Sequence, residues 1–122
     1  MKMEDKNMLS DAEEKILAIL MKSDEDMTLD ELTEQARLRY GKEWKIQTMA
    51  TFLTRMQKKG YVSIYKVGRY SHYHPEISLD NYRLVMLNRV KDLLFGGSWE
   101  NIGEFINYMR DIGWEKSQEL QQ

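Results

Sequence analysis

Hydrophobic residues recur at helical spacing in the first part of the chain, and two of these runs begin with a capping box. In such a box the N-cap side chain and the side chain three residues later each accept a hydrogen bond from the other residue's backbone N–H. The boxes are Ser10 with Glu13, and Thr28 with Glu31. The apolar residues that follow them predict helices over about 11–22 and 29–39.

A third helix is predicted over about 46–59, where four apolar residues have the i, i+3, i+4, i+7 spacing of a buried stripe: Met49, Phe52, Leu53 and Met56. The periodicity then changes. Between Tyr61 and Pro75, β-branched and aromatic residues form two short runs around Gly68. This pattern predicts a β-hairpin.

The last part of the chain predicts two more amphipathic helices. The first covers about 78–95, and Gly96 and Gly97 interrupt the helical pattern directly after it. The second begins after Ser98, which is suited to the N-cap position, and its apolar residues fall on one face as far as Ile112.

The composition is that of an ordered, mostly helical protein, with 42% apolar and 31% charged residues in 122 and a single proline. No cysteine is present, which excludes a disulfide framework, a thiolate metal site and a cysteine nucleophile. The sequence begins with acidic and polar residues and has no long apolar run, so neither a signal peptide nor a membrane insertion is expected. The expected location is cytoplasmic.

The net charge of −2 hides a strong segregation of charge along the chain. Between Arg37 and Arg69 there are nine Lys or Arg and one acid, Glu43, which gives this segment a net charge of +8. The rest of the chain carries nine basic and 19 acidic residues, a net charge of −10. A protein with such a block can present a surface that binds a polyanion even though its overall charge is ordinary.

Three helices followed by a hairpin, with the basic charge on the third helix and the hairpin, are typical of a winged helix-turn-helix. In that fold the third helix enters the major groove of DNA. The expected fold class is therefore mainly α with a small β-hairpin. A winged helix DNA-binding domain is expected over residues 8–76, followed by a helical dimerisation region over residues 77–116.

The polar side of the third helix carries amides, hydroxyls and cations but no acid. A helix that is merely solvated normally mixes Glu with Lys, whereas an acid beside DNA would be repelled by phosphate. Amides and hydroxyls read base edges, and Lys or Arg binds phosphate or guanine. The predicted DNA-binding residues, including two cations at the hairpin tip, are Lys45, Gln47, Thr48, Thr51, Arg55, Lys58, Lys66 and Arg69.

Two candidate metal sites do not meet the requirements of a metal. The acids Asp24, Asp26 and Asp30 alternate as in a calcium loop, but Leu29 and Gln35 stand where that loop needs Gly and a bidentate Glu. These acids are expected to favour a helix N-terminus instead. His72 and His74 share a strand face and are the only histidines, so ordinary packing and hydrogen bonding are expected there. No metal, cofactor or enzyme activity is predicted, because no nucleophile motif or phosphate loop occurs either.

The last two helices carry more apolar surface than a small three-helix domain can cover. We therefore expect a homodimer that presents two recognition helices to a palindromic site. The predicted dimerisation residues are Met86, Val90, Leu94, Trp99, Ile102, Phe105, Ile106 and Met109. An alternative is a ligand-sensing winged-helix regulator of another class, with an effector pocket between these helices lined by Met86, Trp99 and Met109, although such residues are more often plain core.

The sequence resembles the BlaI/MecI family of penicillinase repressors. The resemblance rests on "LSDAEEKILAIL", "W..QTMATFLTRMQKKGYV", "GRYSHYHP" and "LLFGGSWENIGEFI", which together span nearly the full length in order. It implies a dimeric, sequence-specific transcriptional repressor that binds palindromic operators of the TACA/TGTA kind. For members that control β-lactam resistance genes, it also implies an upstream membrane sensor protease that causes their inactivation.

Two departures from the family pattern bear on regulation. The cleaved Asn–Phe step of the family aligns here with Asn88–Arg89. Copper-responsive relatives carry a C-terminal cysteine cluster, and this sequence has no cysteine. The inducing signal therefore remains open at the level of the sequence.

Overall fold

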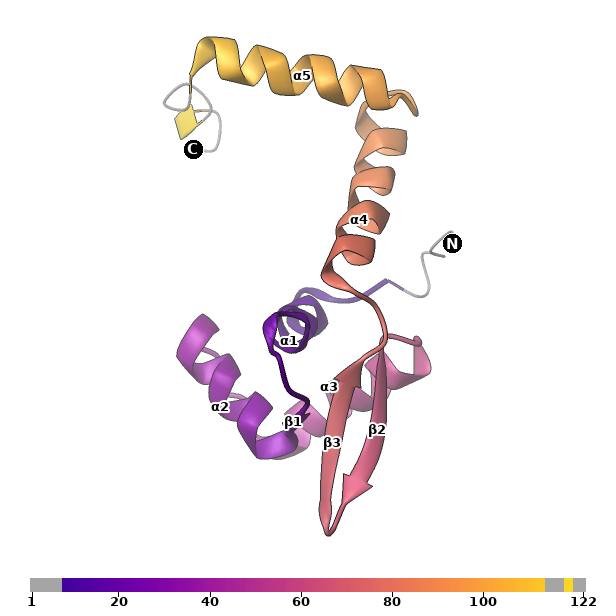
Figure 1. Cartoon of the computed structure of the whole chain (residues 1–122). Coiled ribbons are helices and arrows are strands. Elements are labelled where there is room, and N and C mark those ends of the chain that lie inside the picture. The colour runs from indigo at the N-terminus through magenta and orange to yellow at the C-terminus, as the bar shows by residue number, and fades with distance from the viewer. Residues whose placement is uncertain (1–7, 114–117, 120–122) are drawn as a thin grey trace. The chain divides into compact units, whose positions relative to one another are not determined.

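The computed structural model describes residues 8–113 and 118–119, and its contacts divide the chain into two compact units with the division between Tyr82 and Arg83 (Figure 1). The boundary predicted from the sequence follows residue 76. Residues 114–116, at the end of the predicted helical region, lie outside the described residues. The architecture is mainly helical with one small sheet, as predicted.

The first two helices begin at the predicted capping boxes. Helix α1 spans Asp11–Lys22 and α2 spans Leu29–Tyr40. In the first box Ser10 N donates to the Glu13 carboxylate (2.9 Å) and Glu13 N donates to Ser10 Oγ (3.2 Å). The box before α2 is formed in the same way. Each box satisfies two backbone N–H groups that a helix start would leave unpaired.

Helix α3 spans Ile46–Lys58 and places the predicted apolar stripe in the core. Met49, Leu53 and Met56 are fully buried. Phe52 is partly buried and packs edge-on against Trp44, with ring centroids 5.1 Å apart. The stripe thereby fixes which side of α3 is left facing solvent.

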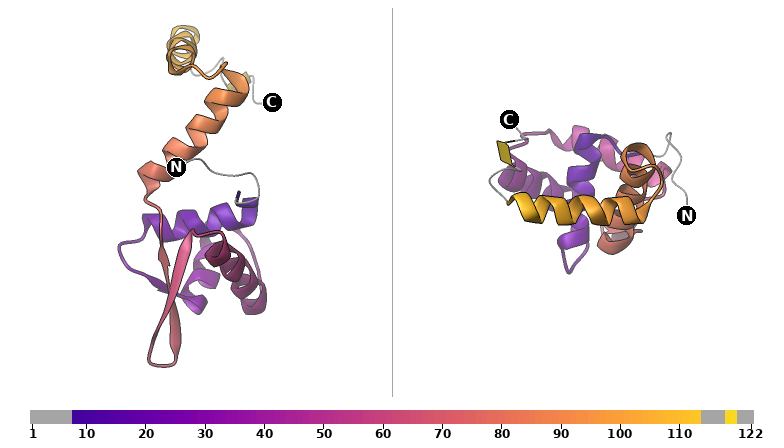
Figure 2. Two further views of the ribbon diagram at one scale, coloured as in Figure 1. Left: turned by 90° about the vertical axis from the view of Figure 1, so that its right-hand side faces the viewer. Right: turned by 90° about the horizontal axis from the view of Figure 1, so that it is seen from above.

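The sheet has three antiparallel strands in the order β1-β3-β2. Strands β2 (Val62–Val67) and β3 (Tyr70–Pro75) form the predicted hairpin, which extends past the helices (Figures 1 and 2). Strand β1 (Met27–Thr28) pairs with β3 and was not predicted. Two residues are too few to show a strand period, so only the pairing with β3 defines this strand.

The core of the first unit draws on all three helices and the sheet. Helix α1 packs against α2, α3 and β3, and α3 packs against β2. The buried apolar side chains are Leu9, Ile16, Leu17, Ile19, Leu20, Leu32, Ala36, Met49, Leu53, Met56, Tyr61, Val62 and Tyr73. This core holds α3 and the hairpin in one body.

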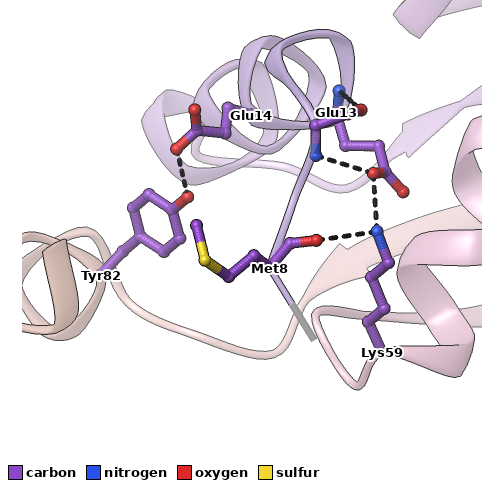
Figure 3. Close-up of polar contacts among 6 residues, drawn as sticks. Met8, Glu13, Glu14, Lys59 and Tyr82 are labelled. Carbon is purple, nitrogen blue, oxygen red and sulfur yellow. Dashed lines mark hydrogen bonds and ion pairs between the residues drawn. The ribbon is translucent and has the colours of Figure 1, made fainter. Parts of the chain in front are cut away.

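Helix α4 spans Leu79–Leu94, and its first turn belongs to the first unit. The Tyr82 hydroxyl donates to a Glu14 carboxylate oxygen of α1 at 2.5 Å, as Figure 3 shows. The Tyr82 ring also packs edge-on against Tyr61, with centroids 6.2 Å apart. The beginning of α4 is thus attached to the core by both a ring contact and a hydrogen bond.

Helix α5 spans Trp99–Ile112 and follows a tight turn after α4. Gly96 and Gly97 adopt left-handed backbone angles, with φ of 60° and 75°. The Ser98 side chain caps α5 by accepting from Asn101 N. Within the described chain, none of the helices is long and apolar enough to cross a membrane.

Candidate nucleic-acid interface

The solvent-facing side of α3 carries the polar residues that the sequence analysis assigned to DNA. Gln47, Thr51, Arg55 and Lys58 are exposed, and Thr48 is partly buried. No residue of the first helical turn is acidic. The side opposite the buried stripe is therefore polar, accessible and free of negative charge along α3.

Two threonines on this face turn their hydroxyl groups toward their own helix. Thr51 Oγ1 donates to Gln47 O at 3.0 Å, and Thr54 Oγ1 donates to Ala50 O at 3.0 Å. This back-bonding uses the hydroxyl proton. The hydroxyl oxygen of Thr51 still has acceptor capacity, and its methyl group offers an apolar contact of the kind that thymine methyl groups make.

The basic residues of the chain divide into those with an acidic partner and those without one. Arg37 is paired with Glu34 at 2.6 Å, and Lys59 with Glu13 at 2.8 Å. The predicted DNA-binding cations make no ion pair with any residue that the structure describes: Lys45, Arg55, Lys58, Lys66 and Arg69. All five are exposed. Their charges are thus available to a polyanion.

The neighbours Lys58 and Lys59 have different surroundings. Lys58 is exposed at the end of α3, whereas the Lys59 ammonium donates to the backbone oxygen of Met8 (2.9 Å) and to the buried Glu13 carboxylate (2.8 Å), as drawn in Figure 3. Lys59 therefore attaches the end of α3 to the start of α1. The sequence predicted Lys58 as a DNA-binding residue but did not predict that Lys59 pairs with Glu13.

The hairpin carries the remaining predicted contacts at its tip. Gly68 has a left-handed φ of 64°, which suits the tight turn between Lys66 and Arg69. Both cations are exposed, and so are Val67 and Tyr70 beside them. The hairpin, called the wing from here on, therefore presents two positive charges next to apolar side chains.

The histidines of the wing take part in hydrogen bonds and ring stacking. His72 stacks on Tyr65, with centroids 5.5 Å apart, and its Nδ1 lies 3.3 Å from Tyr70 O. His74 Nδ1 lies 2.8 Å from the Asp26 carboxylate. No group of three or more His, Asp or Glu that could hold a metal ion occurs in the described part of the chain.

Asp26 contacts the wing, although the sequence predicted only that it would favour a helix N-terminus. Besides His74, it accepts a hydrogen bond from the Tyr65 hydroxyl at 2.5 Å. The hydrogen bond from Tyr65 and then that from His74 lower the pKa of the Asp26 carboxyl below its ordinary value. Its alternation with other acids was visible in the sequence, but the partners lie 39 and 48 residues away.

The second unit exposes much of its apolar surface. No residue of α4 or α5 is buried, although both helices lie within the described residues. Within this unit Phe95 packs against Phe105, and Lys91 lies over the Trp99 ring at 4.9 Å. Of the predicted dimerisation residues Met86, Ile102 and Met109 are half-buried, and the exposed ones are Val90, Leu94, Trp99, Phe105 and Ile106.

The sequence matches a family model over nearly its whole length. The model describes the penicillinase repressor and covers residues 9–122. The chain belongs to the penicillinase repressor family. This family consists of transcriptional repressors rather than enzymes, so the chain is a transcriptional repressor with a winged helix, and the resemblance seen in the sequence is confirmed.

One solved structure agrees with this membership. The solution structure of the DNA-binding domain of the repressor BlaI is 28% identical to this penicillinase repressor family member, with a TM-score of 0.53. The match covers 67% of this chain and 94% of that one. PerR from Streptococcus pyogenes, described in terms of peroxide sensing and gene regulation, is 16% identical with a TM-score of 0.48, covering 56% of this chain and 47% of that one. No curated protein sequence gives a significant match.

Proposed function

We propose that this repressor binds a palindromic operator as a homodimer, with α3 of each copy in the major groove and the wing beside it. The observation that carries the proposal is the solvent-facing side of α3, which has no acid and whose cations lack acidic partners among the described residues. Arg and Lys without internal partners lose no ion pair when they bind phosphate. Such a surface therefore favours a polyanionic ligand.

The proposed division of labour on α3 follows from the chemistry of each side chain. Gln47, Thr48 and Thr51 have amide, hydroxyl and methyl groups that distinguish base edges. Arg55 and Lys58 anchor the sugar-phosphate backbone, together with Lys45 before the helix. Lys66 and Arg69 extend the phosphate contacts through the wing.

The proposed homodimer is supported by the exposed apolar surface of α4 and α5. Monomeric proteins rarely leave large contiguous apolar patches in water. A second copy would cover this surface and join two half-site affinities into one, which raises the overall affinity without any new contact to DNA. Two α3 helices would then address half-sites about 34 to 36 Å apart.

The regulated genes and the releasing signal are carried over from the family as proposals. We infer control of β-lactam resistance genes and an upstream membrane sensor protease as partner. Asn88–Arg89, which aligns with the family's cleavage step, lies inside the continuous helix α4. A protease needs an extended strand of substrate, so cleavage at this step would first require local unfolding of α4. Genes for a membrane protease beside this one would support the proposed partner.

A salt titration tests the proposed interface. Binding to a palindromic duplex of the TACA/TGTA kind is measured by fluorescence anisotropy between about 50 and 200 mM salt. With five cations in each of two copies, the slope of log K against log salt can be no steeper than roughly −9. We expect a slope between about −4 and −9. A flat plot would refute the interface.

A matched pair of variants locates the interface on α3. Arg55→Ala should weaken binding to all sequences and make the salt slope less negative by about 1 for each phosphate that the side chain no longer neutralises. Arg37→Ala removes the same charge from α2, where the guanidinium is already paired with Glu34, and should leave the slope unchanged. Equal effects of the two substitutions would argue for a nonspecific effect of net charge.

A further inference from the structure

One carboxylate connects both strands of the wing to the rest of the winged helix. Asp26 lies in the segment between α1 and β1. Its Oδ2 accepts from the Tyr65 hydroxyl of β2 at 2.5 Å, and its Oδ1 lies 2.8 Å from Nδ1 of His74 in β3. A single side chain therefore holds two neighbouring strands at once.

The surroundings of Asp26 strengthen this connection. Tyr65 and His72 are paired across β2 and β3 and stack with an interplanar angle of 20°. Directly after Asp26, strand β1 pairs with β3 through Met27 and Thr28. Backbone pairing, ring stacking and the carboxylate thus act together on the middle of the wing, between its buried end at Val62 and its exposed tip.

Asp26 has no other evident role in the fold. The N-terminus of α2 is capped by Thr28 and Glu31, so Asp26 is not its cap. The side chain of Asp26 is only about a quarter exposed, and both of its carboxylate oxygens are directed to the wing. Unlike the exposed neighbouring acid Asp24, Asp26 is thus held by two side chains of the wing.

The geometry points to Asp26 as a positioning residue that sets the orientation of the wing, so that Lys66 and Arg69 reach the DNA backbone. This inference rests on the proposed function, because it presupposes that the wing contacts DNA. A two-stranded hairpin is only marginally stable in water unless it is packed against other elements. The core holds the hairpin at Val62 and Tyr73, and Lys66 and Arg69 lie beyond the last side chain that Asp26 contacts. Without these contacts the outer part of the hairpin would leave both cations distributed over more positions.

Positioning of the wing and simple electrostatics predict opposite changes in DNA affinity for the substitution Asp26→Asn. Asp26→Asn removes a negative charge from a DNA-binding protein, and by long-range attraction alone it should tighten binding. If Asp26 positions the wing, the same substitution weakens binding, because an amide accepts hydrogen bonds more weakly than a carboxylate and offers one oxygen in place of two. The sign of the change therefore separates the two explanations.

The experiment measures operator affinity at fixed salt for three single variants. We expect Asp26→Asn to weaken binding about tenfold, as for the loss of a charge-assisted hydrogen bond. Tyr65→Phe removes one of the two partners without any change of charge and should weaken binding about threefold. Asp24→Asn is the matched control: it removes the same charge two residues away, where the side chain is exposed, and should leave binding equal or slightly tighter.

The same substitution in a second background shows whether the effect passes through the wing. With Lys66→Ala and Arg69→Ala already present, Asp26→Asn should cause no further loss, since the groups that it positions are gone. Equal weakening in both backgrounds would indicate a general structural defect and overturn the inference. Hydrogen exchange of the β2 and β3 amides should be faster in Asp26→Asn and unchanged in Asp24→Asn.

The outcomes also separate this inference from the proposed function. Tighter or unchanged binding by Asp26→Asn, while Lys66→Ala with Arg69→Ala weakens binding, would overturn the inference and leave the proposed interface standing. If the double variant with Lys66→Ala and Arg69→Ala bound the operator as tightly as the wild-type protein, both the proposed wing contact and the inference would be refuted.

Discussion

Lys59 and Glu13 form an ion pair in the first unit, with Nζ 2.8 Å from Oε1, although 46 residues separate them in the sequence. The Glu13 side chain is only 3% exposed. Its Oε1 also accepts from Ser10 N and so completes the capping box of α1. The other oxygen, Oε2, has no hydrogen-bond partner among the described residues. One carboxylate therefore joins the start of α1 to the end of α3.

Substituting the two adjacent lysines should separate stability from DNA binding. Lys59→Met removes the partner of a buried charge, and we expect it to lower the free energy of unfolding by about 2 to 3 kcal/mol. Lys58→Met changes an exposed residue and should alter stability by less than about 0.5 kcal/mol. Urea denaturation measures both effects.

The same pair should give the opposite order in a DNA-binding assay. Lys58→Met should weaken operator binding and make the salt slope less negative by about 0.9 for each phosphate left without its cation, while Lys59→Met at a temperature where it stays folded should change the slope little. If Lys59→Met flattened the salt dependence as much as Lys58→Met, the assignment of Lys59 to the fold would be wrong.

The ion pair also predicts how stability depends on pH. Burial opposes ionisation of Glu13, but hydrogen bonds from Lys59 and Ser10 outweigh it, so the pKa of Glu13 lies below its ordinary value. Because the folded-state pKa is the lower one, the stabilisation is fully present above the unfolded-state pKa and is lost as the pH falls through the folded-state pKa. Thermal unfolding should therefore show a falling Tm from about pH 5 downward. Glu13→Gln, which cannot titrate, should show a shallower fall, and parallel curves would contradict this account.

The main elements of the fold were predictable because their signals are local. The capping boxes at Ser10 and Thr28 lie within three residues of their partners, and the buried stripe of α3 is a helical repeat. Strand β1 was missed since only its pairing with Tyr73 and His72 makes it a strand. A pattern within the sequence does not reveal a contact that depends on how distant segments fold together.

The candidate site was predictable only in part for the same reason. The absence of acids on α3 and the cluster of cations are visible in the sequence, and the structure adds which cations have partners. Lys58 was predicted to bind DNA from its position on the helix, whereas the pairing of the adjacent Lys59 with Glu13 was not predicted. Asp26 was assigned to a helix N-terminus from its local position alone. Its contacts with Tyr65 and His74 span 39 and 48 residues, so no local pattern shows them.

The back-bonded hydroxyl of Thr51 predicts which of its groups contributes to base recognition. Since Oγ1 donates its proton to Gln47 O, the hydroxyl can only accept, and we expect the methyl group to make the contact with a thymine methyl. Thr51→Val keeps that methyl and should preserve discrimination, whereas Thr51→Ser removes it and should cost about 0.8 kcal/mol, or about fourfold, at one base pair.

Replacing operator thymines by uracil, one at a time, tests this assignment. At the contacted position uracil lacks the methyl group, so it should weaken binding of the unchanged protein and of Thr51→Val, but not of Thr51→Ser. If uracil at every tested position weakened DNA binding by Thr51→Ser as much as binding by the wild-type protein, the Thr51 methyl would not contact a thymine.

The exposed apolar surface of the second unit gives the prediction for the homodimer. Leu94 is 69% exposed at the end of α4, so a charge there should not disturb the folded chain. Phe105 is a less clean choice, because its ring packs against Phe95 at 5.6 Å within the same chain. Leu94→Glu should therefore give folded monomers, since a carboxylate in the proposed interface would be buried without a partner.

Light scattering at micromolar concentration measures the mass, with Leu38→Glu as the matched control. Leu38 is 60% exposed on α2, in the first unit, and its substitution should leave a dimer. Operator affinity should fall by a factor of about 100 to 10,000 in Leu94→Glu, because each half-site is then bound separately. A monomeric mass for the unchanged protein would refute the homodimer. A dimeric mass for Leu94→Glu would instead exclude the end of α4 from the interface, because a buried charge there could not be tolerated.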